Sequence, residues 1–287
     1  MTSPNFAGRN ARRFKAPSVI PGFGLTFGYT LLYLGLVVLL PLAALIWRSS
    51  GLGLSGLYDI ATEPRVAAGL RTTFFISFCA ALVDLFFGLI VAWVLTRYDF
   101  FGRRLLDAFV DLPFALPTAV AGISLAALYA PNGWFGEPLA AYGIKIAYTR
   151  WGILVALIFI GLPFVVRTVQ PIVAELETEL EEASATLGAS RVQTVLRVLL
   201  PPLAPALLTG FALAFARSIG EYGSVIFIAG NIAYVSEIAP LLIVVKLEQY
   251  DIPGATGIAT IMLAISFAAL LAINLVQAFA RKRFGHV

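Results

Sequence analysis

The sequence of 287 residues contains little charge: only 13% of its residues are Asp, Glu, Lys or Arg, whereas 60% are hydrophobic. A soluble domain carries about 25% charged residues to cover its surface. The mean hydropathy of the chain is +0.90. Hydrophobic runs of roughly 20 residues recur along it, and each is long enough to cross about 30 Å of hydrocarbon. The composition therefore predicts an all-α integral membrane protein and excludes a soluble globular domain.

Cysteine and histidine are almost absent as well. Cys79 is the single cysteine, so an internal disulfide and a cysteine-based metal cluster are excluded. The single histidine, His286, is the penultimate residue, which argues against histidine-centred catalysis and a helical zinc motif. No Gly-Lys dipeptide occurs, so the chain lacks the phosphate-binding loop of an ATPase. We expect no catalytic residue, no metal and no cofactor in this chain.

Six apolar segments are predicted to cross the membrane. They are residues 25–47, 70–96, 107–130, 152–172, 202–230 and 256–280. The fifth segment is long and contains polar residues, so we expect it to be tilted or broken. Residues 25–280 therefore form the membrane domain, between a flexible basic leader (1–24) and a basic tail (281–287).

The distribution of Lys and Arg predicts the orientation of these helices, because basic residues gather on the cytoplasmic side. With the N-terminus in the cytoplasm, thirteen of the 20 Lys and Arg residues are cytoplasmic and five are external. The thirteen are Arg9, Arg12, Arg13, Lys15, Arg97, Arg103, Arg104, Arg167, Arg191, Arg197, Arg281, Lys282 and Arg283. The chain is thus predicted to be a multi-pass protein of a bacterial-type inner membrane, with both termini cytoplasmic. Arg48 follows the first span without a small-residue cleavage site, so we expect a retained helix and not a signal peptide.

One cytoplasmic connection, residues 173–200, is too long and too regular for a simple linker. It begins with five glutamates and ends with two arginines, a distribution that suits the dipoles of short helices. Gly188 is expected to end one helix and start a turn. Pro201 and Pro202 are expected to stop this element and to open the fifth span.

This loop carries a long sequence motif. It reads Glu182-Ala183-Ser184, three residues, Gly188, nine residues, Val198, one residue, then Leu200-Pro201. The pattern resembles the "EAA" signature of ABC importer permeases at every spacing, with Ser184 in place of alanine and Val198 in place of isoleucine. The alternative, a merely solvated charged loop, does not account for such spacing. Three further stretches, residues 111–122, 161–171 and 211–225, together with 238–243, resemble the oxyanion branch of this family of binding-protein-dependent (MetI-like) permeases. As a set they are similar to its sulfate/thiosulfate permeases.

The resemblance implies a six-helix permease of the type I ABC importer fold and assigns a role to the loop. The loop forms a coupling helix that docks on a separate ATPase subunit: Glu182 meets a basic group there, Ala183 allows close approach and Gly188 makes the turn. The implied partners are a second permease subunit of the CysW type, two copies of a CysA-type ATPase that binds ATP and Mg, and a periplasmic sulfate-binding protein. This chain is then not an enzyme but a transport subunit that moves sulfate or thiosulfate inward.

Charged and kinking residues inside the spans are the candidates for a translocation pathway, because charge at membrane depth is costly and often functional. Arg217 and Glu221 lie four residues apart and are expected to pair, either to brace helices or to face the anion. Pro113 and Pro117 are expected to bend the third span and to free backbone carbonyls. Asp84 and Asp111 have no obvious local partner, and we assign them no role.

Two other functions remain open at this point. A homodimeric molybdate or tungstate permease shares the Ala-Arg-Ser-Ile-Gly-Glu stretch of residues 216–221. A secondary transporter would also have about six spans, but it should show related halves, and the EAA loop would have no purpose in it. A channel filter and the motifs of an intramembrane enzyme are absent from the sequence.

Overall fold

The computed structural model describes the backbone of residues 23–284 and the side chains of residues 23–279, and these residues are helical with no β-strand. The all-α prediction is confirmed. Most of the predicted leader (1–24) and the end of the predicted tail (281–287) lie outside the described residues. The chain divides into two units, residues 1–47 and 48–287, and each is considered by itself.

The described part of the first unit is an apolar helical rod. It consists of α1 (Phe23–Leu34), a π-helical turn η1 (Gly35–Leu39) and most of α2 (Leu40–Ser50). The stretch Phe23–Ser50 has 28 residues and the apolar composition of a membrane span, and at 1.5 Å per residue it is about 42 Å long. The first predicted span is thus a continuous helix.

The π-turn has a local cause that recurs later in the chain. Pro41 follows η1 by two residues, and a proline ring clashes with the carbonyl four residues before it. In the wider turn the Leu40 N–H bonds to the carbonyl of Gly35, five residues back. The helix therefore passes a proline without ending.

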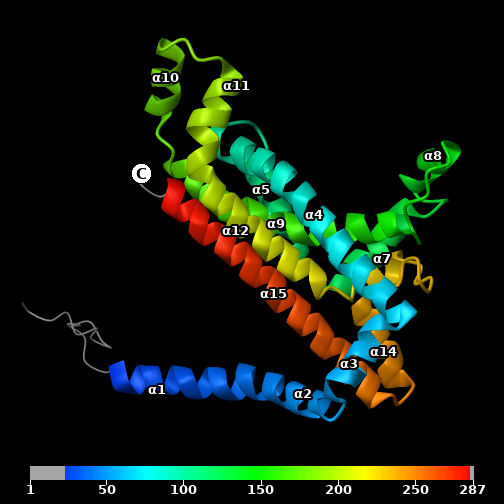
Figure 1. Ribbon diagram of the computed structural model, residues 1–287. Helices are drawn as coiled ribbons and strands as arrows, with labels where there is room; N and C mark the ends of the chain where they lie inside the picture. The colour runs from blue at the N-terminus through cyan, green and yellow to red at the C-terminus, as the bar shows by residue number, and fades with distance from the viewer. Residues whose placement is uncertain (1–22, 285–287) are drawn as a thin grey trace, which may run out of the picture. The chain divides into compact units, whose positions relative to one another are not determined.

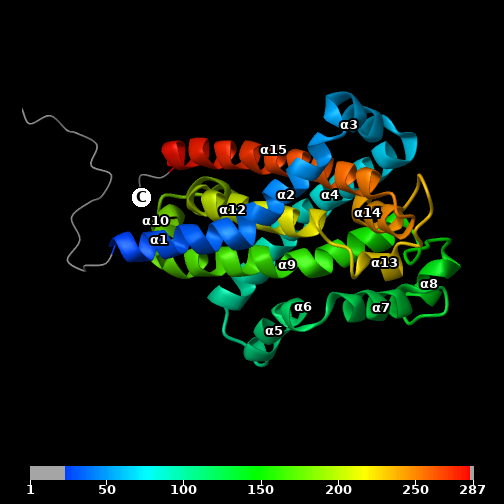
Figure 2. The same ribbon diagram turned by 90° about the horizontal axis from the view of Figure 1, so that it is seen from below.

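The second unit contains the packed core (Figures 1 and 2). Its elements are α3 (Gly53–Thr62), α4 (Pro64–Arg97), α5 (Arg103–Val110), α6 (Leu112–Ala115), α7 (Thr118–Tyr129), α8 (Gly136–Ala141), α9 (Arg150–Glu175), α10 (Thr178–Thr186), α11 (Arg191–Thr194), η2 (Val195–Leu199), α12 (Leu200–Ile219), α13 (Val225–Ile228), α14 (Ala239–Glu248) and α15 (Ile252–Phe284). The helices α4 and α9 both finish at the same end of this unit, which we call the α10 end. We call the opposite end the α8 end.

The helices α4, α9 and α12 form the centre of the unit, and α15 packs against α12. Small residues let these helices approach closely, as in many membrane proteins. A Cβ placed on Gly88 of α4 would lie 2.7 Å from the Val165 side chain of α9, and one on Gly210 of α12 would lie 3.0 Å from the Cα of Val165. Val165 is fully buried between the two glycines. The three helices therefore interlock at this level.

Within the described residues, five helices are long and apolar enough to span a membrane: Phe23–Ser50, Pro64–Arg97, Arg150–Glu175, Arg191–Ile219 and Ile252–Phe279. They correspond to five of the six predicted spans. The third predicted span, 107–130, is not continuous, because it is divided into α5, α6 and α7. Leu116 and Pro117 have extended backbone at the second interruption. A residue before proline is pushed out of helical geometry, which explains the break.

The start of the fifth span differs from the prediction. Pro201 and Pro202 do not stop the preceding element: α11, η2 and α12 run on as one stretch, Arg191–Ile219. The π-turn η2 precedes Pro201 by two residues, and the Leu200 N–H bonds to the carbonyl of Val195. As at Pro41, the wider turn removes the clash of the proline with the carbonyl behind it. The far end of the span is broken as predicted, since α12 ends at Ile219 and α13 begins only at Val225.

Candidate functional site

The two interrupted helices meet in the interior of the second unit. A Cβ placed on Gly122 of α7 would lie 2.7 Å from the Cα of Ser224, in the turn that joins α12 and α13. A Cβ placed on Gly223 of the same turn would collide with the Thr118 hydroxyl of α7. The backbone of α7 therefore lies directly against the break in the fifth span, and only glycine allows this approach.

Arg217, in the last turn of α12, and Glu221, inside the break, form the predicted ion pair. The Arg217 Nη1 lies 2.6 Å from the Glu221 Oε2. The other carboxylate oxygen, Oε1, accepts hydrogen bonds from the Ser224 N–H at 2.9 Å and from the Ser224 hydroxyl at 3.0 Å. Glu221 is only 3% exposed, whereas the Arg217 side chain is 35% exposed. The carboxylate is thus held by the turn, and it fixes one side of a half-exposed guanidinium.

The other N–H groups of the guanidinium face no acidic side chain in the part of the chain that the structure describes. Within the described side chains, Glu221 is the only ion-pair partner of Arg217. A guanidinium has five N–H donors in a planar fork that matches the oxygens of an oxyanion. Leu213, one turn earlier on α12, is also exposed, so Arg217 lies on an accessible face of this helix.

Pro113 and Pro117 lie apart from this pair, in the interrupted third span. Pro113 is the second residue of the short helix α6, and Pro117 immediately precedes α7. Pro117 sets the start of the helix whose Gly122 contacts the fifth span. The structure thus brings the α7 start, Arg217 and Glu221 into one region, whereas Pro113 lies toward the α10 end.

The predicted coupling loop is a pair of short helices at the α10 end. Glu182 and Ala183 are exposed on α10. Gly188 has a positive φ of 80°, and it forms the predicted turn between α10 and α11. Ser190 caps α11 by accepting from the Gln193 N–H at 3.3 Å, while the Gln193 side chain accepts from the Ser190 N–H at 2.8 Å.

Serine at the third position of the Glu-Ala-Ser motif has a visible role. Ser184 is buried, and its hydroxyl lies 2.9 Å from the Thr194 hydroxyl of α11. It also donates to the carbonyl of Glu181 at 2.8 Å. These contacts lock the two short helices together and leave Glu182 and Ala183 on the outer surface.

Arg97, the last residue of α4, connects this loop to the core. It donates to the Leu176 carbonyl at 2.9 Å and lies 3.3 Å from the Glu181 carboxylate of α10. Its guanidinium also stacks over the Trp93 ring at 5.3 Å. A displacement of α10 would therefore be transmitted to the end of α4.

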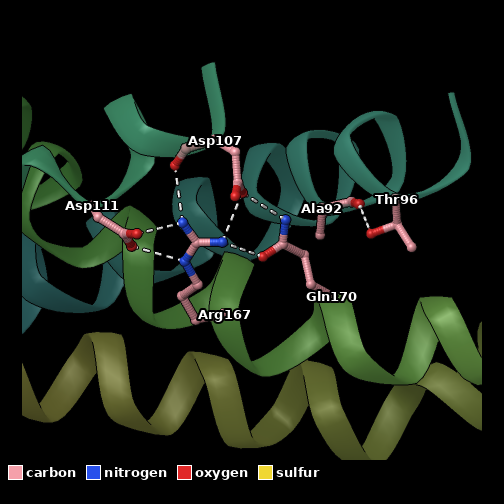
Figure 3. Close-up of polar contacts among 6 residues, drawn as sticks. All are labelled: Ala92, Thr96, Asp107, Asp111, Arg167 and Gln170. Atoms are coloured by element: carbon pink, nitrogen blue, oxygen red, sulfur yellow. Dashed lines mark hydrogen bonds and ion pairs between the residues drawn. The ribbon is translucent and has the colours of Figure 1, made fainter. Parts of the chain in front are cut away.

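Sequence reasoning missed a second polar network near the α10 end (Figure 3). Arg167 of α9 forms a bidentate pair with Asp111, at 2.7 Å and 2.6 Å, and contacts the Asp107 carboxylate at 2.7 Å. Gln170 donates to the same Asp107 carboxylate at 3.1 Å. The network ties α5 and the start of α6 to α9. The only sequence signal was the spacing of Asp107 and Asp111, four residues apart, because their partner is some 60 residues away.

Asp84, unlike Asp107 and Asp111, has no polar partner among the described residues. It is fully buried in α4, and neither carboxylate oxygen has a hydrogen-bond partner among the described residues. A Cβ on Gly161 of α9 would collide with this carboxylate. The absence of a local partner agrees with the prediction, and the structure shows no ligand-facing position for Asp84.

Known proteins resemble this chain over most of its length. Among curated relatives, "Sulfate transport system permease protein CysT" of Salmonella typhimurium is 51% identical over 93% of this chain and 97% of its own length. The protein of the same name from Synechococcus elongatus is 49% identical over 90% of this chain and 92% of its own length.

The fold has solved counterparts. A bacterial ABC transporter involved in the import of the acidic polysaccharide alginate has a chain that aligns with a TM-score of 0.72, at 14% identity, over 89% of this chain and 96% of that one. The MetNI methionine ABC transporter aligns with a TM-score of 0.56, at 18% identity, over 75% of this chain and 95% of that one. These similarities confirm the type I ABC importer permease fold.

The family model "Binding-protein-dependent transport system inner membrane component" matches residues 84–286. This range contains the interrupted spans, the Arg217–Glu221 pair and the coupling loop. The chain therefore belongs to the family of binding-protein-dependent transport system inner membrane components.

Proposed function

We propose that this chain is a permease subunit that carries sulfate, and with it thiosulfate, inward through an ABC importer. The observation that carries this proposal is the 51% identity to a sulfate permease over 97% of that protein's length. The half-exposed Arg217 supports it, because a guanidinium held from one side by a buried carboxylate presents its remaining donors to a tetrahedral oxyanion.

The translocation site proper is proposed at the break of the fifth span. Glu221 neutralises part of the Arg217 charge, so an anion is attracted without being held too tightly to leave. Interrupted helices at membrane depth expose backbone groups where a pathway passes, and the α7 contact through Gly122 makes this break rigid. Pro113 and Pro117 shape the pathway through the third span and have no polar side chain with which to contact the anion.

Coupling to ATP hydrolysis is proposed to occur through α10. Glu182 and Ala183 are exposed, and Leu187 at the end of the helix is 87% exposed. A charged residue, a small residue and an exposed leucine on one short helix suit docking into a cleft of another protein. The chain of contacts from α10 through Glu181 and Arg97 then reaches α4.

The remaining partners and the orientation follow from the same proposal. The ATPase, two copies of a CysA-type subunit, lies at the α10 end and holds ATP and Mg, so the α10 end and both termini face the cytoplasm. A CysW-type permease subunit completes the pathway, and a periplasmic sulfate-binding protein docks at the α8 end. The excess of Lys and Arg in the α10-end segments supports this orientation.

The coupling role is tested by Glu182→Lys in the purified complex reconstituted into proteoliposomes. We expect the complex to assemble. Sulfate uptake, and the stimulation of ATP hydrolysis by sulfate, should both fall at least tenfold, because the reversed charge is repelled by the basic group that Glu182 meets on the ATPase. Glu179→Lys, the same change at an exposed position of the same helix, should have a much smaller effect. Normal uptake by Glu182→Lys would contradict the coupling role.

The pathway role is tested by Arg217→Ala and Arg217→Lys. We expect Arg217→Ala to assemble with its partners but to lose most sulfate uptake, since the buried Glu221 then repels the dianion. Arg217→Lys keeps the charge but not the planar fork, so uptake should be intermediate. If Arg217→Ala transports at the wild-type rate, Arg217 does not contact the anion.

A further inference from the structure

The segment that follows α4 exposes aromatic and aliphatic side chains at the α10 end. Tyr98 is 56% exposed, Phe101 is completely exposed, and both lie in the turn between α4 and α5. Since α4 is a membrane span that ends at Arg97, these residues lie where the chain leaves the hydrocarbon. Amphipathic aromatic rings are enriched at this level of a bilayer.

The helix α5 has two different faces. Asp107 points to α9, where it binds Arg167 and Gln170, and Val110 is buried. Leu105 and Phe109 are more than half exposed and lie on the opposite side of the helix, and Leu106, on its flank, is also about half exposed. A short helix with one polar, anchored face and one apolar, uncovered face is typical of a helix in the plane of a membrane interface.

A crevice of about 830 Å³ opens beside this helix, between the ends of α4 and α9 and the α4–α5 turn. Its walls are both apolar and charged. They include Leu95, Phe100, Arg103, Arg104, Asp99 and Asp107. A lining of this kind suits a molecule with a charged head and an apolar body.

The three arginines around the crevice are matched in number by three aspartates, but one of the arginines has no ion pair within the described residues. Arg103 pairs with Asp99, and Arg167 pairs with Asp107 and Asp111. Arg104 is exposed and has no ion-pair partner among the described side chains. Arg104 therefore presents a guanidinium without an acidic partner among the described side chains, next to the exposed apolar side chains of α5.

We propose that residues Tyr98–Phe109 and the adjoining crevice bind an anionic phospholipid. The headgroup phosphate pairs with Arg104, and the acyl chains lie along Leu105 and Phe109. Basic pockets at the ends of membrane helices bind anionic headgroups in this way. The assignment of the lipid to the cytoplasmic leaflet rests on the proposed orientation of the chain, and no other part of the inference depends on it. Bound lipid would brace α5, and through Asp107 it would brace α9 beside the coupling loop.

Native mass spectrometry of the purified complex tests the proposal, with phosphatidylglycerol titrated against phosphatidylcholine. We expect phosphatidylglycerol to be retained preferentially by the unmodified complex. Arg104→Gln should weaken its retention about fivefold, as expected for one interfacial arginine. Lys145→Gln, which removes an exposed charge at the α8 end, should leave retention unchanged. Equal retention of both lipids, or an equal effect of the two substitutions, would overturn the proposal.

A second measurement does not require a stable purified complex. A photoreactive benzoylphenylalanine at position 101, irradiated in whole membranes, should crosslink to lipid. A crosslink to the second permease chain or to the ATPase would show that a protein covers this face and would overturn the lipid site. Crosslinking to lipid in a complex that does not transport sulfate would refute the proposed substrate and leave the lipid site standing.

Discussion

The contact between Gly122 and the break of the fifth span predicts a large effect of a very small change. Gly122→Ala would place a Cβ 2.7 Å from the Cα and 2.8 Å from the carbonyl carbon of Ser224. The nearest atom is the Ser224 carbonyl oxygen at 2.3 Å, and ordinary contacts begin at 3.4 Å, so α7 and the turn must separate by about 1.1 Å (3.4 minus 2.3). The obstacle is backbone, which no side-chain rotation can relieve.

The cost of such overpacking is about 1–3 kcal/mol. For a chain of this size this corresponds to a decrease of about 2–12 °C in the unfolding midpoint. We expect this shift when the purified protein in detergent is heated and the surviving monodisperse fraction is measured by size-exclusion chromatography. Sulfate uptake should also fall, because the separation moves the turn that positions Glu221.

Gly220→Ala is the matched control for this prediction. It adds the same methyl group at the same break, but a Cβ there meets nothing within 4 Å. Its unfolding midpoint should remain within about 1 °C of the original, since surface substitutions usually cost less than 0.5 kcal/mol. Equal midpoints for the two variants would refute the argument that backbone contact through Gly122 holds the site together.

Two further predictions concern the ends of the second unit. Arg167→Met should release α5 and α6 from α9, because it removes the bonds to Asp107 and Asp111. The expected cost is about 1.5–3 kcal/mol, the value typical of hydrogen bonds to charged groups. Amide hydrogen exchange in residues 103–115 should then accelerate, and unchanged exchange would contradict the bracing role of Arg167. At the other end, the Gly254 N–H and the Lys246 ammonium hold the pKa of Asp251 below its ordinary value. The contribution of this ionised carboxylate to the free energy of unfolding should be fully present at neutral pH. It should disappear as the pH falls below about 4 toward the lowered pKa. Asp251→Asn should remove this pH-dependent contribution, which is worth at most about 1 kcal/mol for a partly exposed pair. If the unfolding midpoint of the variant falls with acid as steeply as that of the unmodified protein, the prediction is wrong.

The membrane character and most of the spans were predictable because they depend on local composition. Runs of 20 apolar residues favour a membrane helix, so four predicted spans match continuous helices, and a further continuous helix covers the predicted fifth span as far as Ile219. The turn at Gly188 was predictable for a similar reason, since glycine adopts a positive φ without strain. The break of the fifth span was predicted only in outline, from its length and polar residues.

Proline was interpreted correctly at one position and wrongly at another. Pro117 interrupts the third span as an extended residue, whereas Pro201 and Pro202 lie inside a continuous helix. The difference is the π-turn η2, which widens the helix ahead of Pro201. Sequence alone does not distinguish a proline that breaks a helix from one that a wider turn accommodates.

The polar contacts between distant residues were not predictable. Arg217 and Glu221 are four residues apart, and their pairing follows from that spacing. Arg167 and Asp111 are 56 residues apart, and nothing in either neighbourhood indicates the other. In helices that are apolar on all sides, the sequence does not show which face meets which neighbour, so such pairs appear only in the folded chain.

The most direct test of the account is affinity purification of this chain from its own membranes, with identification of the subunits that copurify. We expect a second, different permease subunit and an ATPase, whose hydrolysis rate rises when a sulfate-loaded binding protein is added. A single permease species whose ATPase responds to molybdate and not to sulfate would contradict the proposed substrate. Purification without any ATPase would contradict the assignment of residues 173–200 as a coupling loop.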